Sequence, residues 1–396
     1  MKIGVITEQY ATGEGTGLFD FLKIVLRGIE SEKDNELYLF FRSDNKGELL
    51  RRFPVWLIKI AEKFIPEESN NQIVTFQEFK NAKIVEYRMN NLNEKIIENG
   101  IDVVFPSMID LGKNLPVKWC LNVWDCQHKY YPQYFSWYMM AYRDWFYNKV
   151  FKYTDAIVVN SQNAKNDFSK FYNVSPDRIK ALPLLPTMDH ALIGEDDDSV
   201  LAKYNLTDPY FIISNRFWKH KSHDVAIKAL SIIVNERKYK VSLVCTGGMT
   251  DYRDKKQTHL NYLKKLVEDN NLQEHVRFLG IIPKKDQIEL MKRAISVVQP
   301  SQFEGDCSGQ IIDAITIGQR AICSDIEPLT EVKDEGHLVY FKLDNVDELA
   351  ERMELFINTP YQRPLYDELI KQEAYYLKRF SDEINRIIKE IVYSKS

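Results

Sequence analysis

The hydrophobic positions of the first half form short runs that alternate with longer amphipathic stretches. The short runs are rich in β-branched and aromatic residues, and helix-like segments separate most of them. Strands that alternate with helical segments are typical of parallel sheets with crossover helices, so the pattern predicts an α/β fold. The strands predicted in this half cover residues 2–7, 36–41, 72–76, 102–106, 118–123 and 156–160.

The same alternation starts again after a turn-rich and charged stretch at 183–199, which holds two prolines and a run of three aspartates. We expect this stretch to link two domains. Beyond Pro364 the apolar positions recur every three or four residues, which predicts a long helix able to close either domain. The strands predicted in the second half cover residues 210–215, 240–246, 275–280, 295–300, 319–324 and 337–341.

The length of the chain supports the same division. A chain of 396 residues exceeds what one core usually organises, because a domain typically takes roughly 100–200 residues. We predict two Rossmann-like domains, at 1–190 and 200–362, with parallel sheets that face each other across a cleft. The helical segment at 363–396 could pack back on the N-terminal domain.

Composition excludes several classes of protein. The net charge of -4 leaves no basic footprint for nucleic acid. Neither a leader pattern nor an apolar stretch of about 20 residues is present, so a cytoplasmic location is expected. Five cysteines, odd in number and scattered, predict neither a disulfide framework nor a zinc site. They are Cys120, Cys126, Cys245, Cys307 and Cys323.

A glycine-rich loop, Gly13 to Gly17, follows the first predicted strand and precedes a predicted helix at 18–28. Such a loop lets the backbone approach a ligand at a helix N-terminus, but a plain tight turn has the same composition. The spacing is not G-x-G-x-x-G and no P-loop lysine follows. A nicotinamide-dependent oxidoreductase would need an acid at the end of the second strand, where Asp44 comes only after an Arg-Ser step, so that reading is disfavoured.

In the second half, Arg216 and Lys221 follow the end of the strand at 210–215. Two cations above the carboxyl edge of a sheet are suited to neutralise a diphosphate, although a solvated basic turn has the same pattern. Glycine turns at Gly247 and Gly280 follow the next two strands, on the same edge of the predicted sheet.

The stretch from Val298 to Gly318 is the most informative. A strand ends at a proline, the following loop carries an acid and two glycines, and a helix is predicted to begin near Ser308. Glu304 could accept hydrogen bonds from sugar hydroxyls and Asp313 from ribose hydroxyls, while N–H groups at the helix start meet a diphosphate.

In order and approximate spacing, these residues resemble family 4 of the nucleotide-sugar glycosyltransferases, and the match covers roughly 205–335 well. The first half is similar in outline, through the Gly15–Gly17 turn, Trp124-Asp125 and the strand at 157–161. The resemblance implies the GT-B fold, retention of anomeric configuration, no required metal or other cofactor, and a UDP- or GDP-linked hexose as donor. It rests on Arg216, Lys221, Gly247, Phe278–Gly280, Pro300, Ser301, Glu304, Gly305, Asp313, Ala314, Gly318, Ser324 and Asp325.

The resemblance also implies roles for single residues. Arg216 and Lys221 would bind the donor diphosphate and, with Glu304 at the hexose, form the catalytic set. Asp313 would bind the ribose, and Gly15 would let the N-terminal loop approach the donor. The further donor-side residues are Gly247, Gly305, Asp306, Cys307, Ser308 and Gly309, and the acceptor-side residues are Glu14, Asp125 and His128.

Three departures from the family pattern bear on the site. Eight residues separate Glu304 from Asp313, where the family has seven between two glutamates. Trp124 stands where the family often has histidine, with His128 a few residues later as either a substitute contact or a structural residue. Glu14 replaces the first of the paired loop glycines.

The sequence thus predicts a retaining hexosyltransferase that acts on a glycan or lipid-linked acceptor in surface polysaccharide or glycoconjugate synthesis. A catalytically silent donor-binding subunit and a sugar-nucleotide epimerase are the alternatives. A basic amphipathic stretch at 49–66 could lie on the inner face of the membrane or pack on the sheet. The aromatic stretch 130–153 could line the acceptor cleft or fill a core, and the core is the preferred interpretation.

Overall fold

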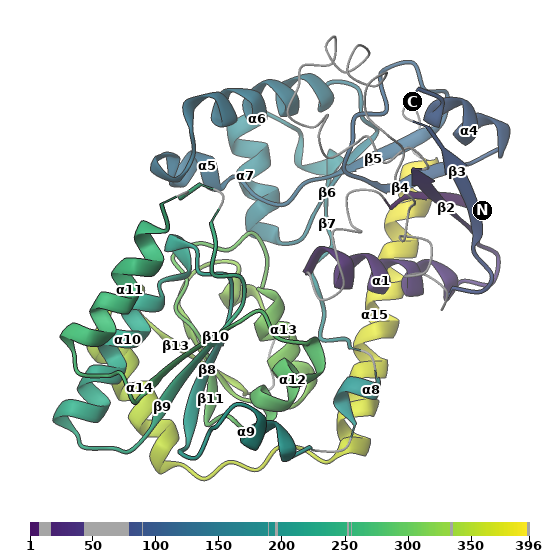
Figure 1. The fold of residues 1–396 in the computed structure, drawn as a ribbon. Coiled ribbons are helices and arrows are strands. Elements are labelled where there is room, and N and C mark those ends of the chain that lie inside the picture. The colour runs from purple at the N-terminus through teal and green to yellow at the C-terminus, as the bar shows by residue number, and fades with distance from the viewer. Residues whose placement is uncertain are drawn as a thin grey trace.

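The computed structural model describes residues 1–7, 17–42, 79–88, 90–188, 190–194, 197–251, 253–254, 256–332 and 336–393. It consists of two α/β domains, one above the other in Figure 1, each built around one parallel sheet. The prediction of two parallel sheets is confirmed.

The N-terminal sheet has seven strands in the order β3-β2-β1-β4-β5-β6-β7, and every pair is parallel. Alternate residues of β1 and β2 enter two different hydrophobic clusters, because successive side chains of a strand point to opposite faces. The strands are β1 Lys2–Ile6, β2 Glu36–Arg42, β3 Lys83–Tyr87, β4 Val103–Ser107, β5 Lys118–Asn122, β6 Ala156–Val159 and β7 Ile179–Ala181.

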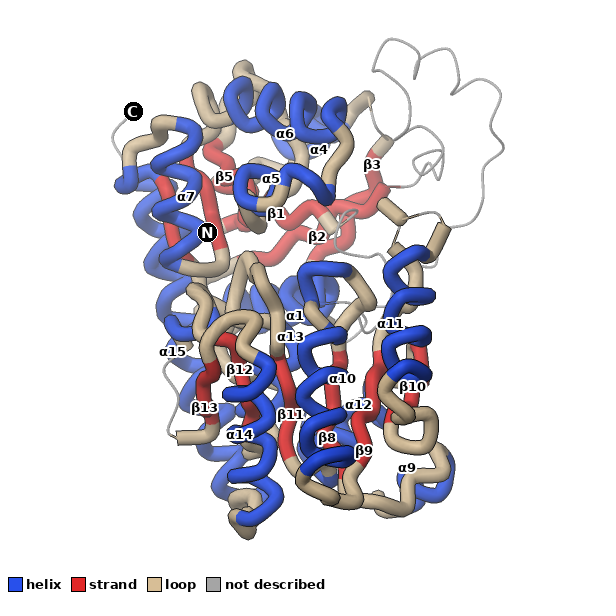
Figure 2. The backbone as a smooth tube through the Cα atoms, turned by 90° about the vertical axis from the view of Figure 1, so that its left-hand side faces the viewer, coloured by secondary structure: helices blue, strands red, loops and turns tan. Residues whose placement is uncertain are grey.

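The C-terminal sheet has six parallel strands in the order β10-β9-β8-β11-β12-β13. Its two faces are covered by separate hydrophobic clusters, and Figure 2 shows α10, α11 and α14 in front of the strands. The strands are β8 Tyr210–Ser214, β9 Ser242–Thr246, β10 Val276–Gly280, β11 Ser296–Gln299, β12 Ala321–Ser324 and β13 Leu338–Phe341.

The helices of the N-terminal domain are α1 Gly17–Glu30, α4 Leu92–Glu98, α5 Gln127–Tyr130, α6 Trp137–Val150 and α7 Gln162–Tyr172. The link between the domains holds α8 His190–Ile193, and α9 Ser199–Lys203 follows. The C-terminal domain adds α10 His223–Ser231, α11 Thr258–Asp269, α12 Lys284–Arg293, α13 Gly309–Thr316 and α14 Val346–Asn358.

The last helix, α15 Tyr366–Tyr393, runs from the C-terminal domain up along α1 of the N-terminal domain. Its first part contributes Leu369 to a cluster of the C-terminal domain, and its later part contributes Phe380, Ile384 and Ile388 to the N-terminal core. Burial of this apolar stripe explains why a helix at the end of the chain returns to the first domain.

One predicted strand lies outside the described residues, and two observed strands, β3 and β7, were not predicted. The strand predicted at 72–76 lies outside the described residues. The strand next to β2 is Lys83–Tyr87, whose exposed lysine and isoleucine are typical of a sheet edge rather than of a buried run. The short strand β7 was not predicted.

The aromatic stretch 130–153 divides between core and surface. Tyr147 and Phe151 are buried, but one face of α6 exposes Trp137, Tyr138, Tyr142 and Trp145 to solvent. Expecting the stretch mainly in the core was therefore wrong for α6. No helix within the described part of the chain is both long and apolar enough to span a bilayer.

Candidate functional site

The strand order of the C-terminal sheet by itself indicates where a ligand-binding site lies. The chain runs outward from β8 through β9 to β10, and then returns to the other side of β8 with β11. In open α/β sheets, ligands bind at such a reversal, outside the carboxyl ends of the strands. The loops that follow β8 and β11 leave this point side by side, and both carry predicted site residues.

The loop after β8 presents two cations. Arg216 is exposed, and its guanidinium lies 5.3 Å from the ring centroid of Trp218. Lys221 ends a 3₁₀ turn, Lys219–Lys221, and Ser222 with φ of 50° then starts α10. This turn directs Lys221 back toward the loop after β11 rather than along α10.

Lys221 and Glu304 form a buried ion pair. The Lys221 Nζ lies 2.6 Å from Oε1 and 2.7 Å from Oε2 of Glu304, and the two side chains are only 12% and 7% exposed. Gln299 at the end of β11 donates to Oε1 of Glu304 at 2.5 Å. The structure thus brings together two predicted catalytic residues that are 83 positions apart in sequence.

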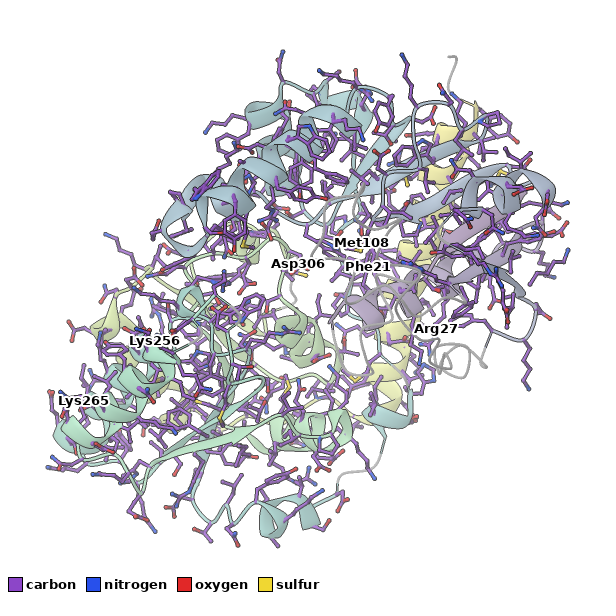
Figure 3. All side chains as sticks on the ribbon, turned by 45° about the horizontal axis from the view of Figure 1, so that its top comes forward. Phe21, Arg27, Met108, Lys256, Lys265 and Asp306 are labelled. Atoms are coloured by element: carbon purple, nitrogen blue, oxygen red, sulfur yellow. The ribbon has the colours of Figure 1, made fainter. Side chains whose placement is uncertain are left out.

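Asp306 lies in the same loop, at the boundary between the two domains in Figure 3. Its carboxylate accepts a hydrogen bond from the backbone N–H of Ser308 at 2.8 Å. Burial and the neighbouring charge of Glu304 raise the pKa of Asp306 to about 6. Cys307 is buried against the Leu184 carbonyl, and burial raises the pKa of its thiol, so it stays protonated.

Asp313 is placed as predicted, on α13, but it has a partner that the sequence did not indicate. Lys284, at the start of α12, lies 2.5 Å from Oδ2 of Asp313, and Gln287 donates to the same oxygen at 3.4 Å. A ribose hydroxyl would have to share Asp313 with this lysine. The signal available in sequence was the cation directly after Pro283, but nothing fixed its distance to Asp313.

Of the acceptor-side residues, Asp125 and His128 are described. Asp125 accepts from the Gln127 backbone at 2.9 Å and from Arg143 at 3.2 Å, close to where Gly305 meets the N-terminal domain. Glu14 and Gly15 lie outside the described residues, as does the stretch 49–66.

His128 does not reach the surface of the site. Its side chain is 1% exposed, and its Nε2 lies 3.0 Å from both Asp144 and Tyr172. Burial lowers its pKa, which keeps the ring neutral. Of the two readings left open for His128, the structure therefore fits the structural one, and the expected contact with a ligand has no geometric support.

Direct contacts join the two domains around this loop. Tyr131 and Tyr134 donate to the carbonyl and side-chain oxygens of Gln302, at 3.1 and 3.3 Å, and Ser161 donates to the Gly305 carbonyl at 2.9 Å. A Cβ at Gly305 would lie 2.9 Å from the Trp124 carbonyl oxygen, so glycine permits this close approach.

A further cation near the site was not predicted. The guanidinium of Arg253 lies 4.6 Å from the ring centroid of Trp218. The guanidinium of Arg216 contacts the same ring, at 5.3 Å. Arg253 also forms an ion pair with Asp251 and a hydrogen bond of 3.4 Å to Gln127 of the N-terminal domain. Arg216, Lys221, Lys284 and Arg253 thus place four basic side chains around the site. Three of them are paired with carboxylates: Lys221 with Glu304, Lys284 with Asp313 and Arg253 with Asp251.

The turn after β9 has a backbone conformation that only glycine adopts without strain, and a substitution at Gly247 tests this. Gly247 has φ of 124°, and an added Cβ would lie 2.3 Å from the Asn215 carbonyl oxygen. Gly247→Ala should therefore lower the free energy of unfolding by at least about 2 kcal/mol, measured by urea denaturation. At Gly309 a Cβ would meet nothing within 4 Å, so Gly309→Ala should be neutral or stabilise by up to about 1 kcal/mol. Equal losses in both variants would contradict this account of the turn.

His223, the first residue of α10, gives a test through pH. It is fully buried and stacked on Phe217, neither ring nitrogen has a hydrogen-bond partner among the described residues, and burial lowers its pKa to about 3. Its unfolded pKa is about 6.5, so below that pH the unfolded chain binds the extra proton and stability falls as pH drops toward 3.

Replacing His223 by phenylalanine keeps the stacked ring and removes this proton. We expect the free energy of unfolding of the wild type to fall more steeply than that of His223→Phe between pH 6.5 and pH 4.5, by up to about 1.4 kcal/mol per pH unit. Denaturation at a series of pH values measures the difference. If the free energy of unfolding fell equally with pH in the two proteins, His223 would not be kept neutral by the folded structure.

Comparison with known proteins finds sequence similarity over part of the chain. Residues 196–374 match the family model of "Glycosyl transferases group 1". The "O-antigen chain mannosyltransferase B" of Escherichia coli is 25% identical over 185 residues, which is 46% of each chain. The "Alpha-1,3/1,6-mannosyltransferase ALG2" of Mus musculus is 26% identical over 163 residues, 39% of each chain. The match thus spans less than half the length of these curated relatives.

Solved structures are similar over their whole length. A glycosyltransferase from Rickettsia africae superposes with a TM-score of 0.66 at 13% identity, covering 100% of this chain and 99% of that one. Anabaena Alr3699/HepE, solved in complex with UDP, superposes with a TM-score of 0.65 at 14% identity and full coverage of both chains. Residues 196–374 therefore match the family model of group 1 glycosyl transferases, within a chain that has the GT-B fold.

Proposed function

We propose that this protein transfers a hexose from a nucleotide diphosphate donor to a glycan or lipid-linked acceptor, with retention of anomeric configuration and without a metal ion. The observation that carries the proposal is the group at the strand reversal. There, Arg216 and the ion pair of Lys221 with Glu304 adjoin the N-terminus of α13. Such a group supplies cations for a diphosphate and a carboxylate for sugar hydroxyls.

The proposed reaction breaks the bond between the anomeric carbon and the phosphate oxygen, and the leaving diphosphate gains negative charge. Arg216, Lys221 and the N–H groups at the start of α13 stabilise that charge. The acceptor oxygen forms the new bond on the same face, and its proton passes to the leaving phosphate oxygen. Glu304 exchanges Lys221 for a sugar hydroxyl as the donor enters, which frees Lys221 for the phosphate.

Mannose is the first hexose to test, because the curated relatives are named as mannosyltransferases. The base is UDP or GDP in this proposal, and HepE shows that the fold accommodates UDP. A role in surface polysaccharide or glycoconjugate synthesis is supported by the name of the O-antigen relative. The location that we propose is the cytoplasm, at the inner face of the membrane.

The test is turnover of a panel of UDP- and GDP-hexoses in the presence of a chelator, with chromatographic detection of the free nucleoside diphosphate and of sugar products. Release of UDP or GDP from one donor, raised by a simple hexoside acceptor, supports the proposal. An epimerised sugar or epimerised nucleotide sugar would identify an epimerase instead. Donor binding with no release in any mixture would identify a silent donor-binding subunit.

A further inference from the structure

The first turn of α7 faces the C-terminal domain with backbone N–H groups. The first N–H groups of an α-helix find no carbonyl acceptor within the helix. In α7 the Lys165 N–H bonds to the Ser161 carbonyl at 3.2 Å, so the N–H groups of Gln162, Asn163 and Ala164 need other acceptors. Ala164 finds its acceptor in the same domain, the Ser161 hydroxyl at 3.0 Å.

Glu331 of the C-terminal domain supplies the other two acceptors. Its Oε2 accepts the Gln162 N–H at 2.7 Å, and its Oε1 accepts the Asn163 N–H at 2.6 Å, from 169 and 168 positions away in sequence. Both hydrogen bonds are charge-assisted, and the carboxylate also meets the partial positive charge of a helix N-terminus. One side chain thus completes the cap of a helix that belongs to the other domain.

Both sides of this contact are held by the core of their own domain. Glu331 ends a 3₁₀ turn, Leu329–Glu331, in which Leu329 is fully buried and its carbonyl accepts the Tyr340 hydroxyl at 3.1 Å. On the other side, α7 buries Ala164 and Phe168 in the N-terminal core. A change in the relative position of the domains would therefore separate Glu331 from α7.

Ser161 connects this contact to the proposed site. Its hydroxyl accepts from the Ala164 N–H and also donates to the Gly305 carbonyl at 2.9 Å. Gly305 directly follows Glu304, which forms the buried ion pair with Lys221. The start of α7 is thus linked to the C-terminal domain at two points, through Glu331 and through the loop that holds Glu304.

We propose that Glu331 is a positioning residue, which keeps the loop after β11 docked on the N-terminal domain. By accepting two N–H groups of α7 it holds Ser161 at Gly305, and the docked loop holds Glu304 in place for the donor. The second step rests on the proposed function, whereas the docking of the loop does not. Because the contact spans the two domains, it forms only when they lie as close together as in Figure 1.

The experiment is hydrogen exchange measured by mass spectrometry, without any substrate, on the wild type and on variants of Glu331. Glu331→Ala removes both acceptors, and Glu331→Gln keeps the length of the side chain but offers only one acceptor oxygen. Thr330→Val is the matched control, because Thr330 is the exposed neighbour of Glu331 on the same turn. Urea denaturation in parallel separates local loosening of the loop from a general loss of stability.

We expect peptides that cover residues 302–308 to exchange at least about 10-fold faster in Glu331→Ala than in the wild type, because loss of hydrogen bonds to a charged group has an effect of this order. Exchange in Glu331→Gln should lie between these two, and Thr330→Val should match the wild type. Peptides from the central strand β8 should be unchanged in every variant. With an identified donor, kcat should fall at least about 10-fold in Glu331→Ala and stay unchanged in Thr330→Val.

Three results would overturn the proposal. One is faster exchange at the start of α7 alone, with residues 302–308 unchanged, which would make Glu331 a helix cap without influence on the site. Another is an equal rise in exchange over both domains with a lower urea midpoint, which would make Glu331 a general stabilising residue. The third is unchanged kcat in a variant whose loop does exchange faster. An inactive wild type would contradict the proposed function instead, and the exchange results would still decide whether Glu331 docks the loop.

Discussion

Replacing Arg216 by alanine is expected to lower kcat by about 10²–10³-fold with whichever nucleotide hexose proves to be the donor. Negative charge grows on the diphosphate as the glycosidic bond to phosphate breaks, and removal of one preorganised donor to such a charge typically has this effect. Because Arg216 is exposed, the fold should survive the change. Steady-state kinetics with release of the nucleoside diphosphate as the readout measures it.

Arg277→Ala is the matched control for Arg216→Ala. Arg277 is a partly exposed arginine of the same domain, 3.8 Å from Glu274 on the surface, and its loss should change kcat by less than about twofold. A similar fall in both variants would trace the effect to a general loss of positive charge. Unchanged turnover in Arg216→Ala would remove this residue from the mechanism.

The second large effect concerns the ion pair between Lys221 and Glu304. Lys221→Met should lower turnover by about 10²–10³-fold and also lower the free energy of unfolding by about 3–5 kcal/mol, because it leaves the Glu304 carboxylate buried without its cation. Adding Glu304→Gln to this variant removes the buried carboxylate charge that Lys221→Met leaves unpaired. The double variant should therefore recover most of the lost stability and none of the lost turnover.

Denaturation and kinetics on the two single variants and the double variant measure this separation. Lys228→Met serves as control, because Lys228 pairs with Asp224 on the surface of α10. If the double variant recovered turnover together with stability, the Lys221–Glu304 pair would have only a structural role. If the single variants were as stable as the wild type, the pair would not be buried as the geometry indicates.

Much of the fold was predictable because parallel strands buried on both faces give unmistakable apolar runs. Strands such as β8 and β11, whose central buried residues are apolar, were found within one or two residues of their observed bounds. The edge strand β3 was not, because only one of its five residues is buried and its sequence KIVEY lacks the run that signals a central strand. The exposed aromatic face of α6 was not predicted either, because the sequence pattern of a helix rich in aromatic residues does not show which of its faces packs against a neighbouring element.

The site was predictable as far as chain order determines position. Arg216, Lys221 and Glu304 follow the carboxyl ends of β8 and β11, and the strand order brings those ends together. The partners of the site residues were not predictable. Lys284 reaches Asp313 from 29 positions away, and His128 is enclosed by α6 and α7, and both facts depend on helix packing rather than on local sequence.

The central claim is that a nucleotide diphosphate hexose binds at the strand reversal through Arg216 and Lys221, without a metal ion. Isothermal titration of UDP- and GDP-hexoses in the presence of a chelator tests it most directly, on the wild type, Arg277→Ala and the double variant Arg216→Ala/Lys221→Met. The account predicts saturable binding of one donor to the first two proteins and none to the double variant. Binding that requires a divalent cation, or that persists in the double variant, would contradict it.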